Sequence, residues 1–215
     1  MESSFALHIP TNLTFQDYFA VTQTARTWAD GYDLKSYAHL ISTLAPQVSV
    51  DYTDVNPDWG KKIYDKEAFA KLWLSEEHLG NSALNTQHLL GLPYFSYVGP
   101  KRPRNEFGNW FAARPTSHGE IAANDQDSEE IEVSWQILAS HGRRATDSAS
   151  EDKDHLPLIG ETSDHRAFMT QVYFKVQDGD QINSSGRVWR LASIKPSPIY
   201  ATGVFSRVRR PSGAP

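Results

Sequence analysis

The spacing of the hydrophobic residues divides this chain into a helical first part and a strand-like remainder. Helical spacing runs from about residue 14 to 31 and returns in two shorter segments, 34–44 and 65–79. After Gly80, apolar and polar residues alternate as in strands, in runs near 84–98, 130–141, 166–177 and 187–199. Helices followed by several strands are typical of an α+β domain. We therefore expect a curved antiparallel sheet with N-terminal helices on one side, forming a cone with an internal pocket.

The first helix carries signals at both of its ends. Thr14, followed three residues later by Asp17, is a capping pair for the N-terminus. Gly31 is a residue that can end a helix, because glycine adopts the left-handed conformation without strain. The sequence thus predicts one helix over about 14–31, with the stretch WADGYD (residues 28–33) at its C-terminal end.

The length and composition allow one sizeable hydrophobic core. The chain has 215 residues, of which 39% are hydrophobic, as in a folded protein of one domain. We expect a single domain over 1–215, with an N-terminal arm at 1–13. Two polar segments, near 99–129 and 142–163, are expected to be loop insertions between paired strands, because they are rich in Gly, Pro, Ser and acidic residues.

Charge and cysteine content exclude several classes of site. The net charge is −5 without a basic stripe, so nucleic-acid binding is not expected. The absence of cysteine excludes disulfides, a thiolate nucleophile and zinc sites with sulfur ligands. No stretch approaches the roughly 20 apolar residues that a membrane span needs. Since the N-terminus also lacks a signal-peptide pattern, we expect a cytoplasmic protein without membrane association.

Three polar side chains fall on faces that should point inward. Tyr52 is in phase with Val48 and Val50, and His88 is in phase with Leu84 and Leu90. His141 lies at the end of the run 130–141, in phase with its apolar residues. Taken singly, each is more simply a hydrogen-bonded core residue or, for His141, a group at a strand end.

Taken together with Tyr32 and Asp33 in WADGYD, the same residues suggest a shared site. Buried polar groups cost free energy unless they are paired, so they tend to meet one another or to line a cavity. A carboxylate bound to one imidazole nitrogen fixes its tautomer and makes the other nitrogen a base. Tyrosine hydroxyls can hold a water or a carbonyl and stabilise an enolate.

WADGYD, the following VDY strand and the TQH strand resemble the scytalone dehydratases. These fungal enzymes share a cone-shaped α+β fold with nuclear transport factor 2 and the small polyketide cyclases. The resemblance runs from about residue 14 to 98 and is weaker over 130–205, where SIKPSPIYATGVFSRV is similar to the last strand and the C-terminal lid of the family. It implies a cofactor-free enzyme, a small aromatic or polyketide-derived substrate and a homotrimer.

The resemblance also implies a role for each site residue. Tyr32 and Tyr52 match the paired tyrosines that hold a water against the substrate carbonyl. His88 matches the proton donor to the departing hydroxyl. His141 matches the base that partners a carboxylate, here Asp33.

The residues that would contact the substrate differ from those of the family. Its later strand offers a Ser and an Asn, where alignment on YFK gives Phe168 and Thr170. Since Thr170 can keep a hydrogen bond and Phe168 cannot, we expect a substrate other than scytalone. Trp110 and Phe205 are candidates for a lid over the pocket. The remaining histidines are expected to be solvated: His8, His39, His78, His118, His155 and His165.

The leading hypothesis is a dehydratase or cyclase acting on an aromatic or polyketide-derived ketone in fungal secondary-metabolite biosynthesis. The same residues would also serve an isomerase, or a pericyclic-type cyclase that uses only the shape of the pocket. A binding module without catalysis is a further alternative. Two histidines with one carboxylate could also form a metal site, although their spacing does not demand one.

Overall fold

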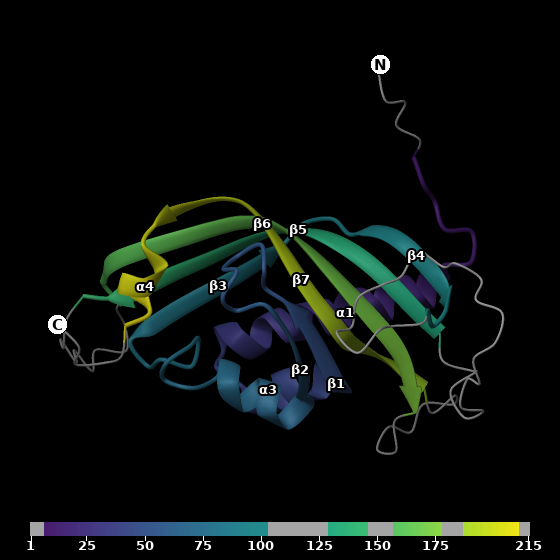
Figure 1. Ribbon diagram of the computed structural model, residues 1–215, viewed down its shortest axis with the longest axis horizontal. Coiled ribbons are helices and arrows are strands. Elements are labelled where there is room, and N and C mark those ends of the chain that lie inside the picture. Colours follow the sequence, from purple (N-terminus) through teal and green to yellow (C-terminus); the bar gives the residue numbers. More distant parts are fainter. Residues whose placement is uncertain (1–6, 103–128, 146–156, 178–186, 211–215) are drawn as a thin grey trace.

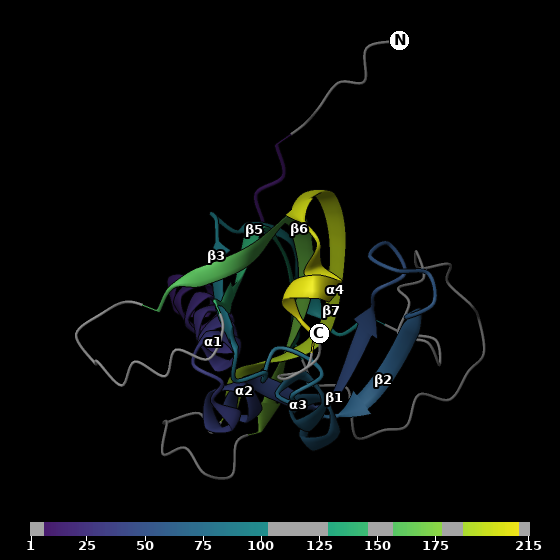
Figure 2. The same ribbon diagram turned by 90° about the vertical axis from the view of Figure 1, so that its left-hand side faces the viewer.

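The computed structural model describes residues 7–102, 129–145, 157–177 and 187–210 as helices packed against one curved sheet (Figure 1). The helices are α1 (Phe15–Asp33), α2 (Tyr37–Thr43), α3 (Lys66–Trp73) and the short α4 (Phe205–Val208). The sheet arches over α1, α2 and α3, while α4 lies at one end of the long strands (Figures 1 and 2). No helix in these ranges is long and apolar enough to cross a membrane.

The sheet has seven strands in the order β2-β1-β7-β6-β5-β3, and β4 pairs with another part of β5. Every pairing is antiparallel except that between β1 and β7. The expected α+β class and curved sheet are therefore confirmed, with one parallel pair inside it. The strands are β1 (Leu44–Asp51), β2 (Lys61–Asp65), β3 (Leu84–Leu90), β4 (Tyr94–Pro100), β5 (Glu129–Arg144), β6 (Ile159–Gln177) and β7 (Arg187–Gly203).

Register shifts bend the longest strand pair. β6 and β7 slip relative to each other between Arg166 and Ala167 and again between Val172 and Tyr173. An extra residue in one strand increases the local twist and bends the sheet. The concave face that results packs its apolar side chains against α1 and α2, and this contact forms the core.

Several element boundaries differ from those that the sequence predicts. α3 ends at Trp73 rather than near residue 79, and the run 84–98 is two strands joined at Gly91. β2 was not predicted at all, because KKIYD is too short and polar to show alternation. β5 and β6 extend into the range 142–163, which we expected to be an insertion.

The N-terminus of α1 agrees with the sequence prediction, and its C-terminus does not. Thr14 caps the helix as predicted: its Oγ1 accepts the N–H of Asp17 at 3.1 Å and donates to the Asp17 carboxylate at 2.6 Å. The prediction that Gly31 ends the helix is wrong, since α1 continues to Asp33 and the left-handed residue is Lys35. Gly31 is instead buried where α2 crosses α1, and a Cβ there would lie 3.0 Å from Leu40.

We predict that Gly31→Ala destabilises the protein. The added methyl group would meet the backbone and Cβ of Leu40, so one of the two helices must move. We expect a loss of about 1–3 kcal/mol in the free energy of unfolding, measured by chemical denaturation. Alanine is the better helix former, so an increase in stability would contradict the close approach of α1 and α2.

Candidate active site

A cavity of about 230 Å³ lies between the concave face of the sheet and the helices. Most of its wall is apolar and comes from β5, β6, β7 and the aromatic residues of α1 and α3. Pockets that are largely apolar with a few convergent polar groups are the usual sites for small molecules. The polar groups here are contributed mainly by tyrosines and histidines, namely Tyr32, Tyr52, His88, His141 and His165.

Asp33 and His88 form a hydrogen-bonded pair beside this cavity. The Asp33 Oδ1 atom lies 2.7 Å from Nδ1 of His88, and its Oδ2 accepts the backbone N–H of the same histidine at 2.8 Å. Both side chains are nearly enclosed, with 16% and 7% of their surfaces exposed. A carboxylate on Nδ1 keeps the proton on that nitrogen and leaves Nε2 for the cavity that His88 lines.

The predicted pairing of Asp33 with His141 is therefore wrong. α1, which ends at Asp33, packs against β3, the strand that carries His88. His141 is on β5, the strand that pairs with β3. His141 instead donates its Nδ1–H to the carbonyl oxygen of Ser163 at 3.2 Å. This bond leaves Nε2 of His141 with its lone pair. Its ring centroid is 5.8 Å from that of His88, so the two imidazoles are neighbours.

Burial sets the protonation state of His141. Enclosure and the neighbouring His88 together lower the pKa of His141 to about 3. At neutral pH the side chain is an uncharged hydrogen-bonding group rather than a proton store. Among the cavity histidines that the structure describes, His88 is the one whose ring is hydrogen-bonded to a carboxylate.

The two tyrosines lie on the α1 and α3 side of the cavity. Tyr32 is buried, with its ring 5.4 Å from that of His88 and 5.1 Å from that of Trp28. Tyr52 follows β1, and its ring is 5.3 Å from that of Trp73. Burial raises the pKa of both hydroxyls, so each remains a hydrogen-bond donor at neutral pH. Four of the five predicted residues thus line one cavity, and Asp33 supports it from behind His88.

Only some of the residues predicted to contact the substrate line this cavity. Phe205, on α4, does line the cavity, and its ring lies 4.6 Å from that of His141. Phe168 is 45% exposed, and it shares with Thr170 the other face of β6. The cause is the period of the strand: Ala167 and Met169 line the cavity, so Phe168 between them and Thr170 after them lie on the opposite face. Trp110 lies outside the described residues.

His165 is a cavity residue that we expected to be solvated. It is half-buried on β6, with its ring 5.6 Å from that of His141, and its Nε2 lies 3.1 Å from the Ser163 hydroxyl. Burial lowers the pKa of His165 below its usual value. The expected strand began at residue 166 and so excluded His165, whereas β6 begins at Ile159. Had the alternation through Ala167 and Met169 been extended backwards, it would have placed His165 on the inner face.

The positions of the acidic and histidine side chains can be compared with those of a metal site, one of the alternatives that the sequence left open. Within the part of the chain that the structure describes, no three His, Asp or Glu side chains are grouped as metal ligands would be. The Asp33 carboxylate is bound by the side chain and backbone of His88, and Nδ1 of His141 by a carbonyl. The arrangement is suited to moving protons between a base and a bound molecule.

Comparisons with known sequences point to one family. The sequence profile of the scytalone dehydratases matches residues 12–102. Dehydratase cfoI from Aspergillus candidus is 38% identical over 211 residues, covering 98% of this chain and 99% of that protein. The scytalone dehydratase of Colletotrichum orbiculare is 33% identical over 81 residues, 37% of this chain and 42% of that enzyme. Scytalone dehydratase arp1 of Aspergillus fumigatus is 35% identical over 89 residues, 40% of this chain and 51% of that enzyme.

Solved structures agree on the fold. The Kfla4162 protein of Kribbella flavida gives a TM-score of 0.53 at 15% identity, covering 91% of this chain and 97% of that one. A Novosphingobium aromaticivorans protein, described provisionally as a scytalone dehydratase, gives 0.51 at 14% identity over 93% and 95% of the two chains. At such identities these likenesses concern the backbone arrangement alone.

We predict that His141 makes the protein sensitive to acid. Below its ordinary pKa of 6.5 the unfolded chain protonates this histidine, while the folded protein excludes the proton down to about pH 3. The free energy of unfolding should therefore decrease as the pH is lowered from about 6.5 to about 3. The decrease is at most about 1.4 kcal/mol per pH unit for one proton. His141→Gln should reduce that slope in denaturation experiments at several pH values.

The exposed His39 on α2 supplies the control, because His39→Gln changes the same residue type outside the cavity. It should leave the slope unchanged. An equal slope in wild type and His141→Gln would mean that His141 takes up its proton in the folded protein.

Proposed function

The chain belongs to the scytalone dehydratase family, and from this premise we propose that it is a cofactor-free dehydratase of an aromatic or polyketide-derived ketone. The observation that carries the proposal is the Asp33–His88 pair, whose free imidazole nitrogen adjoins an apolar cavity. A base of this kind, beside protonated tyrosines, is what elimination next to a carbonyl requires.

The first step is removal of a proton from the carbon beside the substrate carbonyl. Nε2 of His88 takes this proton, and the electrons of the C–H bond move toward the carbonyl oxygen to give an enolate. Asp33 stabilises the imidazolium that forms, since its two oxygens already accept hydrogen bonds from the ring and the backbone of His88. Enclosure strengthens this attraction, because water screens it poorly there.

The tyrosines stabilise the negative charge that develops on the substrate carbonyl oxygen. Their hydroxyls remain protonated, since burial raises the pKa of Tyr32 and Tyr52 alike. They can donate to the carbonyl oxygen, directly or through a water, as negative charge develops on it. Donors that are positioned in advance act without the reorganisation that water would need.

The second step releases water. The enolate electrons return to form the carbon–carbon double bond, the carbon–oxygen bond of the β-hydroxyl breaks, and this oxygen takes the proton from His88 Nε2. His88 is thus both base and acid, which differs from the roles that the resemblance implies. We assign to His141 the orientation of the leaving hydroxyl, because its neutral ring keeps an Nε2 lone pair for the cavity.

We predict that Asp33→Asn lowers the rate of dehydration by about 10²- to 10⁴-fold, since it removes the charge that supports the His88 imidazolium. Bicyclic aromatic β-hydroxy ketones, scytalone among them, would be incubated with enzyme in D₂O. Mass spectrometry would follow water loss and deuterium uptake together. Both should fall in Asp33→Asn, whereas Asp30→Asn, an ion-paired position one turn earlier on α1, should retain them.

The same assay separates the alternatives. Deuterium uptake without water loss would favour an isomerase. Normal turnover in Asp33→Asn would contradict acid–base elimination and favour a cyclase that acts through the shape of its pocket. Saturable binding across the panel, with neither turnover nor exchange in the wild-type protein, would favour a binding module.

A further inference from the structure

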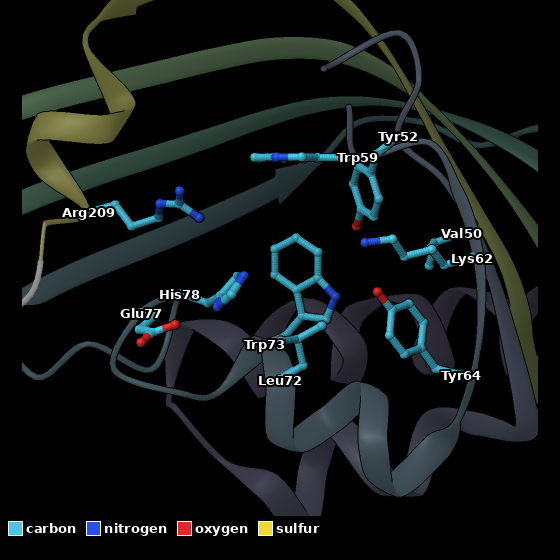
Figure 3. Close-up of a pocket in the computed structure, with 10 residues that line it drawn as sticks. All are labelled: Val50, Tyr52, Trp59, Lys62, Tyr64, Leu72, Trp73, Glu77, His78 and Arg209. Carbon is cyan, nitrogen blue, oxygen red and sulfur yellow. The ribbon is translucent and has the colours of Figure 1, made fainter. Parts of the chain in front are cut away.

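A second pocket, of about 390 Å³, adjoins the cavity beside α3 (Figure 3). The two share three aromatic residues, Tyr52, Trp59 and Trp73, which form the boundary between them. The composition of the second pocket is different, because polar side chains contribute much of its wall. Its remaining lining residues are Val50, Lys62, Tyr64, Leu72, Glu77, His78 and Arg209.

The pairing of β1 with β2 explains why a lysine enters this pocket. Val50 pairs with Lys62, and Val48 with Tyr64, so Lys62 and Tyr64 lie on the inner face of the sheet. Lys61, one residue earlier, is on the outer face, where its ammonium group lies 3.6 Å from Asp51. Two adjacent lysines therefore have opposite orientations, and only Lys62 lines the pocket.

Hydrogen-bond donors gather on one wall of the pocket, which we call the donor wall: Lys62, Tyr64, Tyr52 and Trp73. Figure 3 shows the Lys62 amino group and both tyrosine hydroxyls directed into the same space. Burial raises the pKa of Tyr52 and Tyr64, so both hydroxyls stay protonated. The indole nitrogen of Trp73 faces the same side and has no hydrogen-bond partner within the described residues.

The acidic side chain of the pocket stands on the opposite side of the Trp73 ring. Figure 3 places Glu77 with His78 and Arg209, away from Lys62. Burial and Arg209 lower the pKa of His78, so this ring is uncharged at neutral pH. The guanidinium of Arg209 lies over the Trp59 ring at 5.9 Å. The donor wall thus has no carboxylate of its own among its four residues.

We propose that the donor wall binds a carboxylate carried by the substrate, while the ketone end of the same molecule enters the cavity. Several donors and one ammonium group, with no carboxylate among them, match an anion, and hydrogen bonds to an ionised partner are the stronger kind. The inference rests on the proposed function and narrows its substrate to aromatic ketones with a carboxylate on the side remote from His88. Tyr52, at the boundary, would contact both halves.

Binding of naproxen, a fused bicyclic ring with a carboxylate, can be compared with binding of its uncharged methyl ester by isothermal titration calorimetry. We expect wild type to prefer the carboxylate about three- to tenfold, a modest factor because Lys62 is solvent-exposed. Lys62→Met should remove the preference and leave ester binding unchanged. Tyr64→Phe should reduce it in part. Circular dichroism would verify that both variants are folded.

Lys61→Met is the matched control, since it deletes the same charge from the outer face of the same strand. It should keep the wild-type preference. Equal binding of acid and ester by wild type, no binding of the acid at millimolar concentration, or an equal loss in both lysine variants would each overturn the proposal. The measurement needs no turnover, so its failure leaves the Asp33→Asn result standing, and the reverse also holds.

Discussion

The hydrogen bonds between Asp33 and His88 join the helical layer to the sheet at its exposed edge. β3 is the last strand in the sheet order, so one side of it has no neighbouring strand in the part of the chain that the structure describes. Asp33 accepts the His88 backbone N–H there, and Thr86 donates its hydroxyl to the carbonyl of Tyr32 in the last turn of α1. A sheet edge and a helix end each leave backbone groups unpaired, and here each provides partners for the other. The same contact fixes the His88 ring.

This arrangement distributes charge unevenly among the cavity histidines. The His141 ring contacts the rings of both His88 and His165, yet neither His141 nor His165 has a carboxylate partner among the described residues, and burial lowers the pKa of both. Of the three rings, His88 is the one that is hydrogen-bonded to a carboxylate among the described residues. Because a second imidazolium nearby would be repelled, the neighbours act as neutral dipoles. The base that we propose is therefore selected by Asp33, which lies at the end of α1 and is hydrogen-bonded to His88.

The spacing of residues along the chain predicted which side chains face inward, but it did not predict which side chains contact each other. The alternation through Val48 and Val50 placed Tyr52 correctly, and the phase of His88 and His141 also held. The partner of Asp33 depends on the order of strands, a non-local property that spacing along the chain does not contain. Phe168 was misplaced by a shift of one residue, which in a strand exchanges the two faces. The strand that carries Lys62 was missed because KKIYD is short and polar, and its inner face is defined only by its pairing with β1.

The two pockets together limit how a substrate can lie. The cavity offers mainly apolar walls, so a ring system gains from entering it in either direction. The orientation of the substrate must therefore come from polar groups, and these differ between the two pockets. His88 and Tyr32 line the cavity, whereas Lys62 lines the second pocket, beyond the Trp73 ring. A charged end would lose its hydration if it entered the largely apolar cavity, and this loss costs free energy. In the binding mode that we propose, an anionic group would orient the molecule by exclusion as much as by attraction, with its ketone toward His88.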